Sequence, residues 1–265
     1  MSVVVRFAPS PTGLLHIGNA RLALINWLFA RAHKGEFILR FDDTDRERSE
    51  EKFVNHIRSD LQWLGLDWER EERQFKRLER YNFIANELKN AGLLYACYET
   101  PDELEFKRKR LRAERKAPVY DRSGLRLSEQ EKVDFLRDGR KPHWRFKLQQ
   151  KQISWEDLVR GECQYNTVNL SDPVVIREDN TFLYLLPSVV DDIDFGVTHI
   201  IRGEDHVTNS AIQLEMANAI VPGSTVDLAH IPLLSGADGE GLSKRAGSAG
   251  ILEFKNNGIE PLAVS

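Results

Sequence analysis

The sequence predicts an α/β fold into which a smaller, mixed α+β module is inserted. Strand and helix patterns alternate over residues 1–94, the alternation stops near residue 95, and it resumes after about residue 183. The 265 residues, of which 41% are hydrophobic, suffice for one large domain or for two with separate cores. We therefore divide the chain into a main domain (1–94 and 184–234), an inserted module (95–183) and a C-terminal loop with a helical start (235–265).

The chain opens with a predicted strand, a tight turn and a helix. Residues 3–7 (V-V-V-R-F) form a β-branched run that is closed by two prolines and a glycine. Residues 20–30 are apolar on almost every side, which is typical of a helix packed inside a domain. His16, Gly18 and Asn19 would then lie at a helix N-terminus, where free N–H groups and the helix dipole favour a phosphate. The plain alternative is a tight turn with a surface histidine.

Polar residues follow two further strands at their ends. Residues 36–41 (E-F-I-L-R-F) run into the acidic segment 42–45, and residues 197–201 run into Arg202-Gly203-Glu204-Asp205-His206. In an open α/β sheet, ligands bind beyond the carboxyl ends of the strands, so both segments are expected to face the same crevice as the first turn. For the acidic segment, the alternative is a solvated turn that caps a helix.

Apolar residues at helical spacing predict covering helices over residues 53–64, 78–88 and 212–220. A further strand over residues 226–234 precedes a glycine-rich loop that leads to L-S-K-R at 242–245. Such a basic loop could close on phosphates, although surface loops often have a similar composition.

The inserted module carries the densest positive charge. The segment T-P-D-E at 100–103 is a capping box that predicts a helix start, and Ser128 with Glu131 predicts another. Strand-like pieces follow at residues 143–148, 152–158 and 164–170. The first helix holds seven cations in ten positions, which either neutralise phosphates or form a solvated face: Lys107, Arg108, Lys109, Arg110, Arg112, Arg115 and Lys116.

Composition limits the class of protein. The net charge of −4 argues against a chain that binds nucleic acid through its overall charge. Only Cys97 and Cys163 occur, without C-x-x-C spacing, so neither a disulfide framework nor a thiolate zinc site is indicated. No segment approaches eighteen consecutive apolar residues, and we expect a soluble cytoplasmic protein.

Several motifs occur in an ordered set: R-F-A-P-S-P-T-G-L-L-H-I-G-N-A-R, F-D-D-T-D, V-V-D-D, I-I-R-G-E-D-H and L-S-K-R. Over residues 3–265 the chain resembles the catalytic part of the glutamyl-tRNA synthetase family, within the class I aminoacyl-tRNA synthetases. H-I-G-N would stand for the class signature H-I-G-H, and L-S-K-R for K-M-S-K-S. Separated motifs in the right order are far more specific than any one of them alone.

The resemblance implies a Rossmann-type doubly wound parallel sheet and a ligase that uses ATP with Mg²⁺. L-Glutamate would be activated as its adenylate and transferred to the 3′ end of tRNA, with the inserted module holding the tRNA acceptor end. His16 and Lys244 would be catalytic, through electrostatic stabilisation of the phosphates. The implied amino-acid pocket is Arg6, Ala8, Ser10, Asp42, Tyr184, Ser188 and Arg202. The implied ATP site is His16, Gly18, Asn19, Asp205, His206, Leu234, Lys244 and Arg245. The implied tRNA contacts are Lys107, Arg108, Lys109, Arg110 and Arg112.

The sequence departs from the family pattern at several positions. Asp42 stands where Glu is common, Ser188 where Asn is found, and Gly241 in place of the first lysine of the mobile signature. Zinc-binding members carry C-x-C near the start of the insertion, whereas Cys97-Tyr98-Glu99 supplies a single thiol. The expected cofactor is therefore ATP with Mg²⁺, without a structural zinc or any other protein-bound metal.

Two alternatives to the glutamate–tRNA ligase stay open on the sequence. One is a short paralogue that glutamylates a modified tRNA base, and the other is a catalytically silent RNA-binding paralogue. Family members continue into a helical anticodon-binding region, so we interpret the chain as an excised catalytic fragment, with a naturally short relative as second choice. The expected partners are the tRNA acceptor end, L-glutamate and ATP, with no membrane, and the expected state is a monomer.

Overall fold

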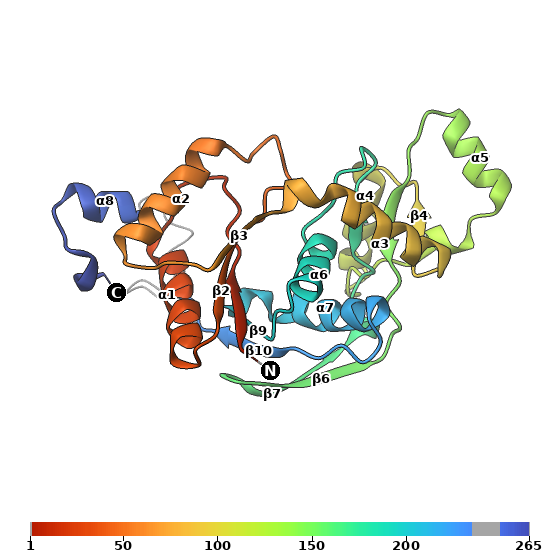
Figure 1. Cartoon of the computed structure of the whole chain (residues 1–265). Helices are drawn as coiled ribbons and strands as arrows, with labels where there is room; N and C mark the ends of the chain where they lie inside the picture. The colour runs from red at the N-terminus through yellow and green to blue at the C-terminus, as the bar shows by residue number, and fades with distance from the viewer. Residues whose placement is uncertain (1, 235–249, 265) are drawn as a thin grey trace.

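The computed structural model describes residues 2–234 and 250–264. Its N-terminal part is a parallel sheet with strand order β1-β2-β3, in which Val5 pairs with Phe37 and Leu39 with Glu71. Helices α1 and α2 connect these strands and pack on the sheet (Figure 1). The elements are β1 (Val4–Phe7), α1 (Ile17–Ala32), β2 (Glu36–Phe41), α2 (Glu51–Trp63) and β3 (Arg70–Arg73).

A second sheet of four strands lies beside β1. Its order is β7-β6-β10-β9, and β9 lies beside β1 because the Thr198 N–H donates to the Val4 carbonyl at 2.9 Å. The chain therefore leaves β1 toward β2 on one side and meets β9 on the other, which makes the β1–β9 boundary the topological switch point. The elements are β6 (Gln152–Asp157), β7 (Gly161–Asn166), α6 (Leu185–Asp194), β9 (His199–Gly203), α7 (Val207–Ile220) and β10 (Asp227–Ile231).

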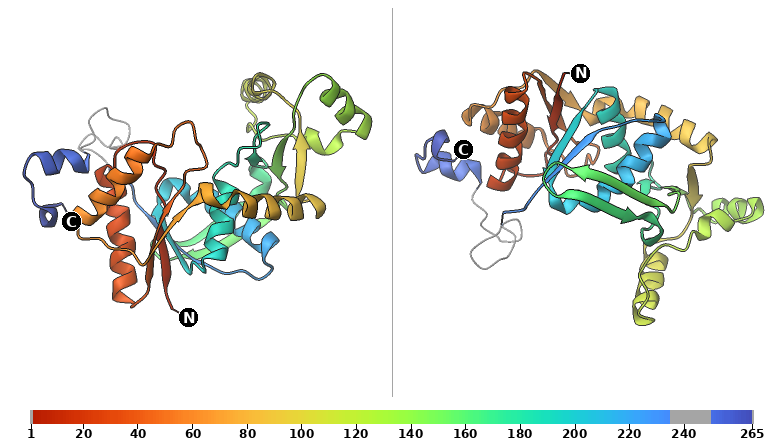
Figure 2. Two further views of the ribbon diagram at one scale, coloured as in Figure 1. Left: turned by 45° about the horizontal axis from the view of Figure 1, so that its top comes forward. Right: turned by 90° about the horizontal axis from the view of Figure 1, so that it is seen from below.

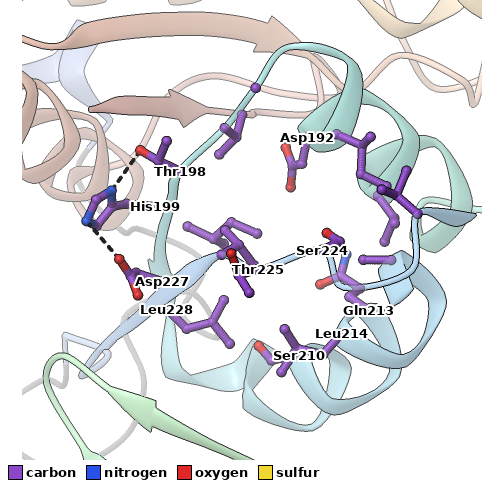
Figure 3. Close-up of a pocket in the computed structure, with 18 of the residues that line it drawn as sticks. Asp192, Thr198, His199, Ser210, Gln213, Leu214, Ser224, Thr225, Asp227 and Leu228 are labelled. Atoms are coloured by element: carbon purple, nitrogen blue, oxygen red, sulfur yellow. Dashed lines mark hydrogen bonds and ion pairs between the residues drawn. The ribbon is translucent and has the colours of Figure 1, made fainter. Parts of the chain in front are cut away.

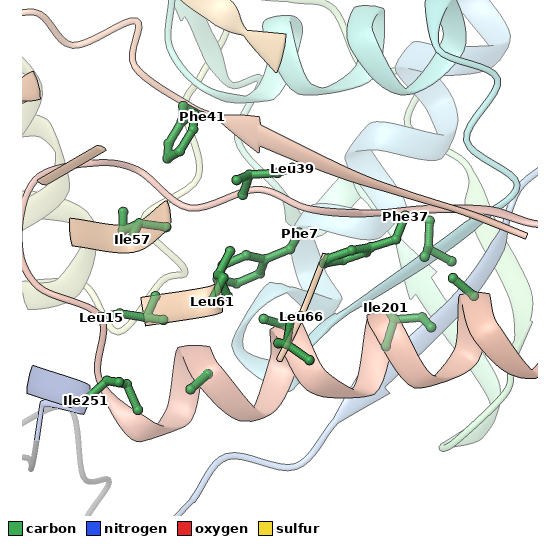
Figure 4. Packing of buried hydrophobic residues seen from close by; sticks show 14 of the residues in the cluster. Phe7, Leu15, Phe37, Leu39, Phe41, Ile57, Leu61, Leu66, Ile201 and Ile251 are labelled. Carbon is green, nitrogen blue, oxygen red and sulfur yellow. The ribbon is translucent and has the colours of Figure 1, made fainter. Parts of the chain in front are cut away.

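Two large apolar clusters hold these layers together. In the first, Phe7, Phe37, Leu39 and Leu61 are all at most 6% exposed and join the sheet to α1 and α2 (Figure 4). In the second, residues of α3 (Leu78–Asn90), α6 and α7 pack together, including Tyr81. Full burial of one such side chain is worth about 1.5–3 kcal/mol, so the clusters fix the strand ends firmly.

The middle of the chain forms a separate antiparallel sheet of order β4-β5-β8. Helices α4 and α5 project from the molecule at the end away from α1 and α8 (Figure 2). Both capping boxes form: Thr100 with Glu103 starts α4, and Ser128 with Glu131 starts α5. The elements are α3 (Leu78–Asn90), β4 (Leu94–Cys97), α4 (Pro101–Ala113), α5 (Glu129–Arg137), β5 (His143–Phe146) and β8 (Val174–Ile176).

The β6–β7 hairpin lies in the same range of sequence but does not join that sheet. β6 pairs in parallel with β10, where Leu228 faces Asp157. The segment 152–166 is thereby tied to β10, which is the neighbour of β9 in the sheet. This link becomes important for the site.

Some elements differ from the sequence prediction. The segment R-E-E-R at 70–73 forms β3, although its four charged residues give no strand signal, because backbone pairing with β2 suffices at a sheet edge. The helical start expected at 258–261 is a 3₁₀ turn over Pro261–Ala263, and the helix there, α8 (Ile251–Asn256), comes earlier. Within the described residues, no helix combines the length and the apolar character needed to cross a membrane.

Candidate active site

A cavity of about 510 Å³ opens at the carboxyl ends of β1 and β9, at the switch point of the sheet. It is lined by the turn after β1, the start of α1, the end of β2, α6, and the ends of β9 and β10. Lys244 and Arg245 lie outside the described residues. All the other residues expected for amino-acid and ATP binding line this cavity: Arg6, Ala8, Ser10, His16, Gly18, Asn19, Asp42, Tyr184, Ser188, Arg202, Asp205, His206 and Leu234.

His16 is the N-cap of α1. Its backbone is extended, and its Nδ1 accepts a hydrogen bond from the Asn19 N–H at 3.3 Å. Burial lowers the pKa of His16, so the ring is neutral at pH 7. A neutral imidazole that accepts at Nδ1 carries its proton on Nε2, which leaves one hydrogen-bond donor for a ligand. A Cβ on Gly18 would lie 3.1 Å from the His16 ring, so glycine leaves room for this ring position.

A largely buried network of ion pairs lines the cavity. Arg40, 1% exposed, pairs with Asp42 at 2.7 Å and with Asp192 at 2.8 Å, and Arg6 pairs with Asp192 at 3.0 Å. Burial raises the pKa of Asp42 to about 6, although the Arg40 charge opposes the rise. Arg40 also donates to the Ser188 hydroxyl at 3.1 Å.

Arg202 differs from the other two buried arginines. Its side chain is almost fully buried, its Nη2 donates to the Ser210 hydroxyl at 2.6 Å, and its Nε has no hydrogen-bond partner among the described residues. No described carboxylate forms an ion pair with it. Burial lowers the pKa of Arg202 to about 10, which still leaves it charged at pH 7. A buried, unpaired guanidinium is costly, and a carboxylate brought by a ligand would offset that cost.

Tyr184 and His206 are neighbours in the cavity lining. Their side chains lie within 3.3 Å of each other, between the tyrosine hydroxyl and Nδ1, and their rings meet edge to face. The strand end is tight at this point, because a Cβ on Gly203 would lie 2.5 Å from an Asp205 oxygen. A larger residue at the end of β9 would therefore require the Asp205 side chain to move.

The sequence prediction missed Arg40, the central cation of the network. It stands in E-F-I-L-R-F, where a single arginine in an apolar strand gives no sign of its direction. A signal for Arg40 was available in two acidic pairs, the one that follows it and the one in V-V-D-D. Four carboxylates next to buried segments need cations to balance their charge, and Arg40 is one such cation. Arg21 was also missed, and its guanidinium holds the end of β10 through the Pro232 carbonyl at 2.7 Å.

The residues expected to contact tRNA lie on α4, outside the cavity. Arg108, Arg110 and Arg112 are at least half exposed and make only long surface ion pairs with glutamates. Lys107 instead points inward, where its ammonium binds Glu99 at 3.2 Å and the Ser123 hydroxyl at 2.9 Å. The exposed members of the set, with Lys109, are the ones free to meet a phosphate backbone.

One group of possible metal ligands occurs in the described part of the chain. Single ligand atoms of Cys97, Glu99 and His143 lie within 4.8 Å of one another. Burial raises the pKa of the Cys97 thiol to about 11 and lowers the pKa of His143 to about 4, so both are neutral at pH 7. Glu99 Oε1 already accepts from Ser123, Lys107 and the Tyr120 hydroxyl. The Lys107 ammonium puts a positive charge where a metal cation would have to bind, while Glu99 Oε2 and His143 Nε2 have no described partner.

Comparison of the chain with known proteins identifies one protein family by both a family model and individual relatives. The family described as "tRNA synthetases class I (E and Q), catalytic domain" matches residues 2–264. The glutamate–tRNA ligase 1 of Rhodospirillum rubrum is 53% identical over 264 residues, and the glutamate–tRNA ligase of Azospirillum brasilense is 51% identical over 266 residues. Each match covers 100% of this chain and 59% of the relative, so the chain spans less than two thirds of these proteins.

A solved structure shows the same fold. The glutamate tRNA ligase of Elizabethkingia meningosepticum, crystallised in complex with its amino acid, superposes with a TM-score of 0.82 at 28% identity. The match covers 97% of this chain and 53% of that protein. The prediction of a doubly wound α/β fold of this family is therefore confirmed.

The Cys97 cluster generates a prediction about metal content. We expect the protein, purified without chelator and dialysed against a micromolar excess of zinc, to hold far less than one zinc per chain. The reason is that only one thiol is present and the Lys107 ammonium opposes a second cation. Elemental analysis measures the content, and the variant Lys107→Met tests whether the ammonium is what excludes the metal. One zinc per wild-type chain would contradict the prediction.

Proposed function

The chain belongs to the class I tRNA synthetases for glutamate and glutamine, and from this premise we propose that it activates L-glutamate with ATP and transfers the glutamyl group to the 3′ end of tRNA. The observation that carries the choice of glutamate is Arg202. This arginine is buried and charged, lacks a described carboxylate partner, and lines a cavity beside an anion-binding helix start. A substrate with a carboxylate on its side chain supplies what this arginine lacks.

In the proposed complex, Arg202 pairs with the side-chain carboxylate of glutamate. Arg6 lies on the same wall but already pairs with Asp192, so it adds positive potential and a second contact. Asp42 faces the substrate ammonium, and Tyr184 with Ser188 encloses the aliphatic part. Ala8 and Ser10 complete the pocket along the first turn.

We place ATP along the first turn of α1 and the end of β10. The His16 Nε2–H and the Gly18 N–H are donors for phosphate oxygens, and Asn19, whose N–H bonds to His16, borders the same phosphates. Asp205, His206 and Leu234 border the adenosine, and Lys244 with Arg245 would add positive charge at the phosphates. The ionised α-carboxylate attacks the α-phosphorus, a P–O bond forms, and pyrophosphate leaves, so no general base is needed.

We propose that Mg²⁺ arrives with ATP and is held mainly by the phosphates. The acidic run after β2 does not suit a protein-held metal, because Asp42 is paired with Arg40 and Asp43 with Arg73 at 2.7 Å. When bound, the ion neutralises charge on the leaving pyrophosphate. In the second step, a hydroxyl of the terminal ribose takes the glutamyl group from the adenylate, while α4 contacts the acceptor end.

The proposed activity predicts glutamate-dependent exchange of pyrophosphate into ATP, measured with and without tRNA. Glutamine is expected to give little exchange, because it leaves the Arg202 charge unpaired. Exchange in neither condition would favour the catalytically silent paralogue. Exchange with glutamate but transfer only to a modified base would favour the short paralogue, and exchange with glutamine alone would reassign the substrate.

His16 is expected to matter through its donor, separately from its cap. Replacing His16 with Ala should slow exchange by about a hundredfold or more, as for loss of one preorganised donor to a developing charge. His16→Ser keeps an N-cap acceptor but has no Nε2–H, so it should be equally slow while retaining more stability. His56→Ala, on α2 outside the cavity, is the control. Near-normal exchange in His16→Ser would show that the histidine only starts the helix.

Asp42 predicts a pH dependence. Burial raises its pKa in the free protein to about 6, so the carboxylate that faces the ammonium is lost as the pH falls through 6 and is gained as it rises. The value of kcat/KM for glutamate should therefore increase about tenfold per pH unit below 6 and level off above 7. At saturating glutamate the rate should depend less on pH, because the bound substrate ammonium favours the ionised form of Asp42. For Asp42→Asn, kcat/KM for glutamate should be low and independent of pH. If this variant kept the wild-type pH dependence, the titrating group would be a residue other than Asp42.

A further inference from the structure

A chain of buried hydrogen bonds leads away from Arg202. Its Nη2 lies 2.6 Å from Ser210 Oγ, Ser210 Oγ lies 2.8 Å from His230 Nε2, and His230 Nδ1 lies 2.5 Å from Asp157 Oδ2. Ser210, His230 and Asp157 are at most 2% exposed. They come from α7, β10 and β6, so three separate elements converge behind one arginine.

The direction of this chain is determined by its ends. Arg202 can only donate, and the Asp157 carboxylate can only accept. Burial lowers the pKa of His230, so the ring is neutral, with its proton on Nδ1 toward Asp157 and its lone pair on Nε2 toward Ser210. The Ser210 hydroxyl therefore donates to His230, and its oxygen lone pairs are left facing Arg202.

The far end of the chain is rigidly held. Asp157 Oδ1 accepts the backbone N–H groups of Val159, Arg160 and His230, each at 3.1 Å. Asp157 ends β6, which pairs with β10 at Leu228. Backbone hydrogen bonds thus fix the carboxylate, which in turn fixes the tautomer of His230.

Behind Arg202 lies a second cavity of about 550 Å³ between α6, α7, β9 and β10. Asp192, Ser210 and Gln213 line it (Figure 3). Arg202 lines both this cavity and the first one. Side chains therefore do not pack tightly on that side of the guanidinium, and its Nε has no described partner. On the side of the guanidinium away from the substrate cavity, the Ser210 hydroxyl is a short hydrogen-bond partner of its Nη2.

We propose that Asp157, His230 and Ser210 are positioning residues that hold the Arg202 guanidinium in the orientation that receives the substrate carboxylate. The inference rests on the proposed function, because it assigns Arg202 to that carboxylate. It adds three residues that do not touch the substrate and that act through Arg202. Fixing the guanidinium before binding removes an ordering cost from the complex.

The first test separates KM from kcat in glutamate-dependent exchange. Ser210→Ala should raise the KM for glutamate about tenfold or more, as expected for a lost hydrogen bond to a charged group, with the KM for ATP and kcat changed less than about twofold. Ser210→Thr, which keeps the hydroxyl, should restore the wild-type KM. Thr167→Val removes an equally buried hydroxyl that takes no part in these hydrogen bonds and is the matched control.

A second variant tests whether His230 acts on Arg202 through Ser210. His230→Asn keeps a donor for Asp157 but withdraws the acceptor from Ser210, so its KM for glutamate should rise as in Ser210→Ala. The double variant should be no worse than either single variant, because both break one chain. Fully additive effects, or a drop in thermal stability with KM unchanged, would overturn the proposal in favour of a purely structural role.

The final readout does not depend on activity. In ¹⁵N-arginine spectra of the wild-type chain, the Arg202 Nη groups should give separate, slowly exchanging signals. Those signals should merge in Ser210→Ala and return in Ser210→Thr. If the wild-type chain gives no glutamate-dependent pyrophosphate exchange but the spectra change as described, the proposed function is refuted and the positioning of Arg202 is not. If the Arg202 guanidinium is equally fixed in Ser210→Ala, the positioning itself is refuted.

Discussion

Burial of arginine at the carboxyl ends of the central strands is the constraint on which the rest of the site depends. Arg6, Arg40 and Arg202 are each at most 8% exposed, and a buried guanidinium is tolerated only when carboxylates or hydrogen bonds compensate it. Helix α6 supplies most of that compensation, because Asp191 and Asp192 both face inward. The helix must therefore lie against β1 and β2, which places its first turn in the cavity wall. For Arg202 the compensation within the described chain comes from hydroxyl groups rather than from an acid.

Much of this arrangement was predictable from the sequence. The strand–turn–helix at residues 3–30, the strand at 36–41 and both capping boxes follow from local patterns, and the structure agrees with them. Local signals work there because each depends on residues a few positions apart. They also predicted which strand ends line the cavity, since carboxyl ends of parallel strands meet at one edge.

The parts that could not be predicted depend on distant partners. Arg40 and Asp192 are 152 residues apart, and Asp157 and His230 are 73 apart, so neither pair has a local signature. Strand β3 was invisible because its sequence is entirely charged and only pairing with β2 makes it a strand. The β6–β7 hairpin reads as part of the inserted segment, yet tertiary pairing adds it to the main sheet. In each case a contact made after the chain has folded overrides the local composition.

The Arg202 charge, which has no carboxylate partner among the described residues, affects the stability of the whole domain. A protein that buries a cation without an acid is less stable than its apolar core would allow, and an anionic ligand that fills the gap returns that free energy. The selectivity for an anionic ligand and the gain in folding stability on binding it then both measure the free-energy cost of burying the Arg202 charge. A neutral ligand of similar shape leaves the Arg202 guanidinium desolvated and unpaired. Discrimination between a carboxylate and an amide would therefore depend less on the shape of the ligand than on whether its charge balances that of the buried guanidinium.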